Sequence, residues 1–136
     1  MIEVTAKVRV RYGETDQMGY VYYGNYPQYF EVGRVELFRA IGMSYKEIEN
    51  FGVMLPVADL SIKYVNPARY DDELSIITFV RKLPEGVRIF FEYEIRNQEG
   101  KLLTTGNTTL YFMDKKTGRI LRCPESILNL MKPFFE

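Results

Sequence analysis

One stretch of the sequence, residues 26–41, is periodic like a helix yet apolar on more than one side, and this most limits what the chain can fold into. An apolar stripe recurs at helical spacing, at Tyr26, Tyr29, Phe30, Gly33, Leu37, Ala40 and Ile41. Three further apolar residues, Val32, Val35 and Phe38, lie outside this stripe. Because a helix that rests on one surface needs only one stripe, the pattern predicts a long helix wrapped by a sheet.

Local signals place the ends of this helix. Asn25 is predicted to be the N-cap, Pro27 falls in the first turn where its missing amide does no harm, and Gly42 provides a stop. Gly33 in the middle of the helix costs about 1 kcal/mol relative to alanine. That cost is understandable if the backbone of a strand approaches the helix closely at this residue.

The remainder of the chain is predicted to be mainly strands. Residues 3–12 alternate apolar and polar side chains, the signature of a half-buried strand. Ser44 and Glu47 have the spacing of a capping box and open a short helix over 44–50. Further strands are predicted at 53–65, 74–82, 87–95 and 102–113, with turns at 97–100 and 115–119 and a closing helical turn at 124–131. We expect these last strands to form an antiparallel meander.

The order of elements predicts the fold class. A strand, then a long helix, then several antiparallel strands are typical of an α+β fold with the helix on one face of the sheet. A curved sheet around one long central helix is the arrangement called a hotdog. At 136 residues the chain has the length of a single domain, predicted to span residues 1–136.

Composition excludes several classes of function. The 18 basic residues equal the 18 acidic ones, so no excess of positive charge indicates nucleic acid or an anionic membrane as a partner. The first residues lack the apolar core of a signal peptide and no stretch is apolar for the length of a bilayer, so cytoplasmic residence is expected. The single cysteine, Cys123 just before Pro124, is expected to be a structural residue, and redox chemistry is not indicated.

The chain contains no histidine. Ser-His-Asp and Cys-His catalysis are therefore excluded within one chain, as are metal sites with histidine ligands. The acidic run at 71–73 lies between two predicted strands and is expected to be a solvated turn rather than a metal site. No P-loop, dinucleotide fingerprint or zinc spacing appears, so neither a metal nor a cofactor is predicted. Any catalysis must use carboxylates, tyrosine hydroxyls, lysine, arginine or backbone amides.

The glycine-flanked loop 13–24 is where such chemistry is expected. Asp16 lies a few residues before a helix N-terminus, where free amides and the helix dipole supply partial positive charge. Acyl transfer needs a nucleophile or a base for water, together with donors for the developing oxyanion. Asp16 could supply the first and the amides around Tyr23 and Gly24 the second. The alternative is that Asp16 only caps a turn or the helix.

Side chains near this loop have two possible roles. The tyrosines that crowd it could position a carboxylate or a carbonyl, or could simply pack at the start of a buried helix; they are Tyr12, Tyr20, Tyr22, Tyr23 and Tyr26. Glu31 and Arg34 are three residues apart on the helix, so a salt bridge between them is expected, with substrate contact as the alternative.

Two separated motifs resemble one family. Residues 10–31 (VRYGETDQMGYVYYGNYPQYFE) are similar to the signature segment of the 4-hydroxybenzoyl-CoA thioesterase family, particularly its Tol-Pal-associated acyl-CoA thioesterase branch. The similarity continues through Arg34 and Glu36 and returns at 64–74 (YVNPARYDDEL), in the same order along the chain. Two motifs that agree on one family are a stronger signal than either alone.

This resemblance implies a hotdog enzyme that hydrolyses an acyl-CoA thioester without metal or cofactor. It further implies a homodimer or homotetramer whose active sites form between subunits. Asp16 matches the aspartate that acts as nucleophile or as base for water. Tyr23 stands where one branch has histidine and another tyrosine, and Tyr12 matches a tyrosine that contributes to the site in the histidine-bearing branch. Substrate contacts are expected at the start of the helix and along it, from Gly24, Asn25, Tyr26 and Glu31.

Three other functions remain open at this point. Hotdog dehydratases use a histidine with an acidic residue, so the absence of histidine from this chain argues against that function. An acyl-carrier-protein thioesterase would differ only in the thioester donor. A non-catalytic acyl-CoA-binding protein could share the fold without turnover, although Asp16 at the family's catalytic position argues against it.

Overall fold

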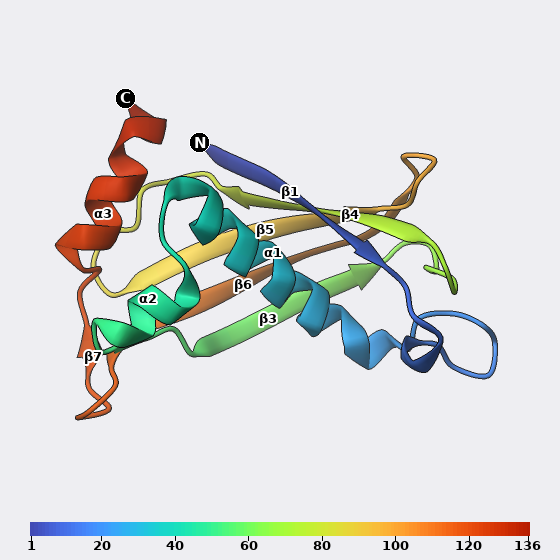
Figure 1. Cartoon of the computed structure of the whole chain (residues 1–136), viewed down its shortest axis with the longest axis horizontal. Coiled ribbons are helices and arrows are strands. Elements are labelled where there is room, and N and C mark those ends of the chain that lie inside the picture. Colours follow the sequence, from blue (N-terminus) through green and yellow to red (C-terminus); the bar gives the residue numbers. More distant parts are fainter.

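The computed structural model describes residues 1–136, with one long helix, α1, lying across a seven-stranded sheet (Figure 1). The strands are β1 (Ile2–Arg9), β2 (Val53–Met54), β3 (Val57–Tyr64), β4 (Glu73–Val80), β5 (Arg88–Arg96), β6 (Leu102–Asp114) and β7 (Ile120–Leu121). The α-helices are α1 (Tyr26–Ile41), α2 (Tyr45–Asn50) and α3 (Glu125–Met131). Three short 3₁₀ helices are η1 (Tyr12–Glu14), η2 (Tyr23–Asn25) and η3 (Lys132–Phe135).

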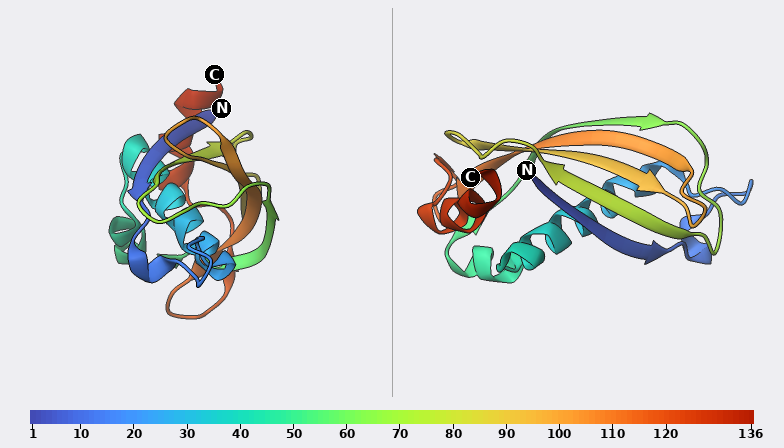
Figure 2. Two further views of the ribbon diagram at one scale, coloured as in Figure 1. Left: turned by 90° about the vertical axis from the view of Figure 1, so that its right-hand side faces the viewer. Right: turned by 90° about the horizontal axis from the view of Figure 1, so that it is seen from above.

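The sheet curves around α1 without closing into a barrel, as the two side views show (Figure 2). α1 packs against the inner face of β1, β4 and β5. This arrangement confirms the predicted α+β hotdog fold. None of the helices combines the length and the apolar character needed to cross a bilayer.

The order of the strands differs from the predicted meander. β4, β5 and β6 are antiparallel neighbours in sequence order, but β3 pairs with β6 rather than with β4. The chain therefore crosses from one edge of the sheet to its interior between β3 and β4, and β1 closes the other edge by pairing with β4. Alternation of side chains places a strand on a face but does not name its neighbour, which explains the error.

Two strands are clearly shorter than predicted, and β4 ends at Val80, two residues before its predicted end. The first ends at Arg9, so Tyr12 belongs to η1 rather than to a strand. The stretch 53–65 is broken into β2 and β3 around Pro56, which cannot donate a ladder hydrogen bond. The short helix α2 begins as predicted, with the Ser44 hydroxyl accepting a hydrogen bond from the amide of Glu47 at 3.1 Å.

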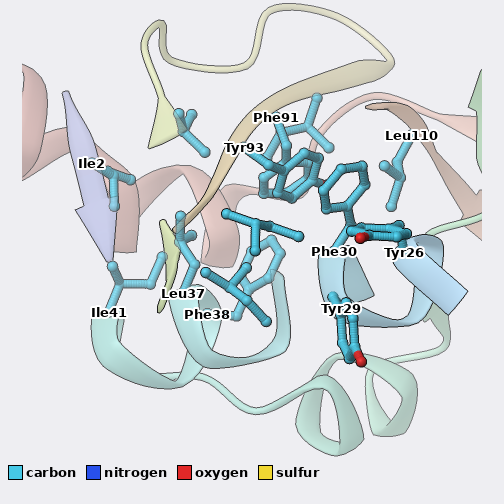
Figure 3. Packing of buried hydrophobic residues seen from close by; sticks show 14 of the residues in the cluster. Ile2, Tyr26, Tyr29, Phe30, Leu37, Phe38, Ile41, Phe91, Tyr93 and Leu110 are labelled. Carbon is cyan, nitrogen blue, oxygen red and sulfur yellow. The ribbon is translucent and has the colours of Figure 1, made fainter. Parts of the chain in front are cut away.

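The core lies between α1 and the inner face of the sheet (Figure 3). Phe30, Leu37 and Phe38 of the helix are fully buried, as are Phe91 and Ile95 of β5. Each such side chain contributes roughly 2 to 3 kcal/mol of transfer free energy. Of the three apolar residues predicted outside the stripe, Phe38 is buried, whereas Val32 and Val35 are half-buried, and Ala40 of the stripe is exposed.

The N-terminus of α1 is not capped in the predicted way. Asn25 occupies the N-cap position, but its side chain makes no capping hydrogen bond. Its Nδ2 instead donates to the carbonyl of Glu14 at 2.8 Å. The C-terminus follows the prediction, because Gly42 has a left-handed φ of 110° that favours glycine.

Gly33 permits a close approach, but by side chains and not by a backbone. A Cβ atom at this position would collide with the hydroxyl of Thr78 and lie 3.0 Å from Cγ2 of Ile76, both on β4. A strand does approach the helix at Gly33, as predicted. The atoms that come close belong to its side chains, so the predicted approach of its backbone is wrong. β-branched side chains on β4 fill the space that the missing Cβ leaves.

Arg34 does not form the salt bridge expected with Glu31. Its side chain turns into the core, only 6% exposed, and Nη1 donates to the hydroxyl of Tyr93 at 3.0 Å. That hydroxyl is also 2.6 Å from Oγ1 of Thr108. Spacing along a helix predicts which of its own side chains can contact each other, but it does not predict hydrogen-bond partners on the sheet that packs against the helix.

Gly106 on β6 provides a second close approach in the core. The ring of Phe30 stacks parallel to that of Tyr93, with centroids 4.1 Å apart and 6° between planes. A Cβ at Gly106 would lie 2.6 Å from Cζ of Phe30 and 2.7 Å from the carbonyl oxygen of Ser61. The Phe30 ring therefore occupies space that only glycine leaves open.

We expect Gly106→Val to lower the free energy of unfolding by about 3 kcal/mol, because added methyl groups must displace a buried ring and a neighbouring strand. Chemical denaturation followed by circular dichroism measures this change. Asn107→Val is the matched control on the same strand, since Asn107 faces the outer side and should change stability by no more than about 0.5 kcal/mol. Equal effects of the two substitutions would contradict this account of Gly106.

Candidate active site

Asp16 lies in the loop between η1 and η2, at the N-terminal end of α1. Its Oδ1 accepts hydrogen bonds from the amides of Met18 at 2.9 Å and Tyr20 at 3.2 Å. The amide of Asp16 donates to the carbonyl of Tyr20, and its carbonyl accepts from Gly19, whose φ of +78° requires glycine or a strained residue. Asp16 thus shapes its own turn, the role that the sequence left open as the alternative.

This turn uses only one carboxylate oxygen. Oδ2 of Asp16 accepts no hydrogen bond, and no cation forms a salt bridge with the side chain. The carboxylate is therefore held in place by Oδ1 and presents Oδ2 to its surroundings. Such a group can act as a nucleophile or as a base while its position stays fixed.

Free amides lie at the positive end of the helix. η2 leads directly into α1, so the two share one N-terminal end. The amides of Tyr22 and Asn25 are used, by the carbonyls of Glu14 and Tyr22 at 2.9 Å each, whereas those of Tyr23 and Gly24 donate no hydrogen bond. Unused amides at a helix N-terminus can bind a developing negative charge.

A pocket of about 390 Å³ brings Asp16 and Tyr23 together. Its other lining residues are Tyr20, Val21, Tyr26, Tyr64, Val65, Asn66 and Pro67. Asp16 is the only acidic residue in this wall. A carboxylate, a helix N-terminus and an apolar wall of aromatic rings therefore border one space.

The tyrosines of the pocket form a continuous aromatic cluster. Tyr64 makes edge-to-face contacts with Tyr23 and Tyr26, at centroid distances of 6.5 and 5.1 Å. Its hydroxyl donates to the carbonyl of Tyr23 at 2.8 Å, which ties β3 to η2. Burial raises the pKa of Tyr26 and of Tyr64, where the nearby Tyr23 adds to the effect. Both hydroxyls therefore keep their protons at physiological pH, and that of Tyr64 is used in the hydrogen bond to Tyr23.

The structure does not bring all the sequence candidates into this pocket. Tyr12 is 77% exposed and, with Asp16, lines a second and more open depression. Gly24 and Asn25 lie beside the pocket rather than in its wall, and Glu31 is on an exposed part of α1. Tyr26 lines the pocket but is itself buried.

Residues of the second motif were missed as site residues. Tyr64, Asn66 and Pro67 line the pocket, yet they are some fifty positions away from Asp16 in the sequence. The side chain of Asn66 is fixed by donating from Nδ2 to the carbonyl of Leu102 at 2.9 Å. The motif at 64–74 was the available signal, because two motifs of one family often border the same site.

Cys123 lies outside this site, and its environment suppresses reactivity. Burial, together with the charge of Glu125, raises the pKa of the thiol to about 12. Since the thiolate is the reactive form, only about one in ten thousand molecules would carry it at pH 8. We expect iodoacetamide to alkylate the folded protein at pH 8 at least about 100-fold more slowly than the unfolded chain, as followed by mass spectrometry. Equal rates would contradict the buried position.

Comparisons with known proteins identify the family of the chain. A model of the thioesterase-like superfamily matches residues 10–131. YneP, a candidate acyl-CoA thioesterase of Bacillus subtilis, is 35% identical over 111 residues, which cover 82% of this chain and 80% of YneP. The acyl-CoA thioester hydrolase YbgC of Escherichia coli is 31% identical over 121 residues, covering 89% of this chain and 90% of YbgC.

A solved structure agrees with these sequence relatives. The DHNA-CoA thioesterase from Staphylococcus aureus superposes with a TM-score of 0.87 and 32% identity, covering 100% of this chain and 97% of that protein. The family match includes the Asp16 loop, α1 and the motif at 64–74. From the fold, the motifs and these relatives together, the chain belongs to the thioesterase-like superfamily.

Proposed function

We propose that the protein is an acyl-CoA thioesterase, which hydrolyses an acyl-CoA thioester to the free acid and CoA with Asp16 as the catalytic carboxylate. One observation carries the proposal. Asp16, which has an otherwise unused carboxylate oxygen, and Tyr23, whose amide at the helix N-terminus is unused, border the same pocket, and Gly24 with the second unused amide follows Tyr23 directly. Thioester hydrolysis requires this pair of features, a group that delivers the nucleophile and donors that stabilise the oxyanion.

In the reaction, the thioester carbonyl oxygen faces the amides of Tyr23 and Gly24. By the general-base route, Asp16 takes a proton from water while the water oxygen bonds to the carbonyl carbon. The negative charge that develops on the carbonyl oxygen is stabilised by the amides. As the intermediate collapses, the carbon–sulfur bond breaks and the CoA sulfur takes the proton from Asp16.

By the nucleophilic route, Oδ2 of Asp16 bonds to the carbonyl carbon and CoA thiolate leaves, which forms a mixed anhydride. Water then hydrolyses the anhydride and regenerates the carboxylate. Many turnovers in heavy-oxygen water distinguish the two routes. Label found in Asp16 by mass spectrometry supports the nucleophilic route, and its complete absence supports the general-base route.

The activity is tested with a panel of thioesters whose acyl groups are aromatic, short-chain or long-chain. Release of CoA is followed with a thiol reagent, and binding is measured separately by calorimetry. Turnover of at least one acyl-CoA supports the proposal. Turnover only of acyl-carrier-protein thioesters would indicate the other donor, and binding without release would indicate a non-catalytic acyl-CoA-binding protein. The two motifs resemble the 4-hydroxybenzoyl-CoA thioesterase family, particularly its Tol-Pal-associated acyl-CoA thioesterase branch, so aromatic and fatty acyl groups are tested side by side.

We further propose that the working unit is a homodimer joined along β3. β3 pairs with β6 on one side only, and α1 packs mainly against β1, β4 and β5. Val57, Leu60 and Tyr64 of β3 are 48%, 42% and 48% exposed. An uncovered apolar edge strand is a template for another chain. Pairing of β3 with β3 of a second copy is self-complementary and would cover these side chains.

The opposite edge of the sheet fits this role less well. α1 packs against β1, and the edge carries Lys7 and Arg9, both paired with Glu73. Charged side chains on an edge strand discourage pairing with another sheet. Because Tyr64 at the end of β3 lines the pocket, a second copy on β3 would add a wall to the active site.

A further inference from the structure

Glu14, two residues before Asp16, joins the loop to the helix through several hydrogen bonds that the proposed mechanism does not use. Its Oε1 accepts from the amide of Arg11 at 2.8 Å and from the hydroxyl of Tyr29 at 3.1 Å. Its carbonyl accepts from Nδ2 of Asn25 at 2.8 Å and from the amide of Tyr22 at 2.9 Å. We call this group of five residues the Glu14 clasp.

The clasp connects three segments that would otherwise move separately. Arg11 immediately precedes η1, and Tyr22 and Asn25 flank the free amides of η2. Tyr29 lies in the first turns of α1, where its ring is buried in the core. Glu14 therefore forms hydrogen bonds with the segment that follows β1, with the two residues that flank the free amides of η2, and with α1.

The burial and the charge of Glu14 favour strong hydrogen bonds within the Glu14 clasp. The side chain of Glu14 is only 13% exposed, so water competes little for its carboxylate. Burial raises the pKa of the Tyr29 hydroxyl, and the nearby charge of Glu14 raises this pKa further. The hydroxyl therefore stays protonated and donates a hydrogen bond to Oε1 of Glu14. Hydrogen bonds to a charged and partly buried acceptor are among the stronger ones in proteins.

The two reacting groups are placed by separate parts of the chain. Asp16 is fixed by its own turn, whereas the amides of Tyr23 and Gly24 belong to η2. The Glu14 carbonyl is bonded to the residue on each side of those two amides, and only Thr15 separates Glu14 from Asp16. The separation between carboxylate and oxyanion donors therefore depends on Glu14.

We propose that Glu14 is a positioning residue. Its carboxylate bonds to Arg11 and Tyr29 and thereby holds its backbone carbonyl, which accepts from Asn25 and Tyr22, so that the distance between the Asp16 carboxylate and the free amides of η2 is set. The inference rests on the proposed thioesterase function. A misplacement of catalytic groups by about 1 Å can cost about 100-fold in rate. Glu14→Ala should therefore lower kcat by at least about tenfold with little change in KM, because substrate binding does not use this residue.

Glu14→Gln is the conservative variant that separates position from charge. The amide oxygen of glutamine can take the place of Oε1 and accept the same two hydrogen bonds, from Arg11 and Tyr29. We expect its kcat to return to within about threefold of wild type. If Glu14→Gln lost as much activity as Glu14→Ala, the carboxylate charge would be required and the positioning role would be overturned.

Tyr29→Phe provides a second variant if Glu14→Ala does not fold. It removes one bond to Oε1 and leaves the buried ring in place, and we expect kcat to fall about threefold or more at unchanged KM. An effect on KM alone, or on thermal stability without kcat, would overturn the positioning role.

A double-mutant cycle with Asp16→Asn tests the link to the carboxylate. Glu14→Ala should have no further effect on kcat once the Asp16 carboxylate is gone, since the clasp acts through it. Full additivity would overturn the proposal. The controls distinguish failure of the positioning role of Glu14 from failure of the proposed thioesterase function. Absence of CoA release by wild type overturns the thioesterase function, whereas active wild type, inactive Asp16→Asn and fully active Glu14→Ala overturn only the clasp.

Discussion

Asp16→Asn is expected to lower kcat for acyl-CoA hydrolysis by at least about 100-fold while leaving the fold intact. The amide oxygen of asparagine can still accept the hydrogen bonds from Met18 and Tyr20 that form the turn. What it loses is the negative charge, and with it the ability of Oδ2 to attack a carbonyl carbon or to take a proton from water. Steady-state release of CoA measures the loss, and thermal unfolding shows whether the turn survives.

Asp114→Asn is the matched control for this substitution. Oδ1 of Asp114 also forms a turn, by accepting hydrogen bonds from the amides of Lys116 and Thr117 at 2.8 and 3.2 Å. Its turn lies at the opposite end of the molecule from the Asp16 loop (Figure 1). The same chemical change at the same kind of turn should therefore leave kcat within about twofold of wild type. Comparable losses in both variants would show that turn geometry, rather than the Asp16 carboxylate, limits the rate.

Leu60→Arg is expected to give the second large effect, by separating the homodimer. In the proposed dimer each Leu60 side chain lies in the covered face, so each protomer would bury an unpaired charge at a cost of about 3 kcal/mol or more. Sedimentation velocity should show dimers for wild type and monomers for the variant. We expect kcat/KM to fall at least about tenfold in the monomer, because the pocket beside Tyr64 loses a wall.

Ser61→Arg is the control for charge on β3. Ser61 is the next residue along the same strand and faces the outer side of the sheet, opposite Asn107. The Ser61→Arg substitution adds the same arginine side chain outside the proposed interface, so the dimer and its thioesterase activity should persist. A wild-type protein that is monomeric and fully active, or a Leu60→Arg variant that remains an active dimer, would exclude β3 as the interface.

The fold was largely predictable because its elements are defined by local patterns. The apolar stripe of 26–41, the capping box at Ser44 and the alternation within each strand depend on residues close in sequence, and the structure confirms these elements. The pairing of β3 with β6 was not predictable from such patterns. Pairing depends on contacts between distant segments, and alternation is equally satisfied by several neighbours.

The position of Asp16 beside the N-terminus of α1 was predictable, whereas the contacts around the candidate site were not. A carboxylate before a helix N-terminus is visible in the sequence, whereas the choice of Asn25 to bond to Glu14 instead of capping α1 depends on how the loop folds back. Arg34 turned into the core because Tyr93 offers a partner there, which helical spacing does not reveal. The lining by Tyr64 and Asn66 arises only when the second motif folds against the first.

The most direct test of the central claim is a crystal structure of Asp16→Asn with an acyl-CoA that the wild type hydrolyses. The proposed function predicts the thioester carbonyl carbon within about 3.5 Å of the residue 16 side chain, the distance of a reactive arrangement. It also predicts the carbonyl oxygen about 3 Å from the amide of Tyr23 or Gly24. A thioester bound elsewhere, or with its oxygen turned away from η2, would contradict the claim.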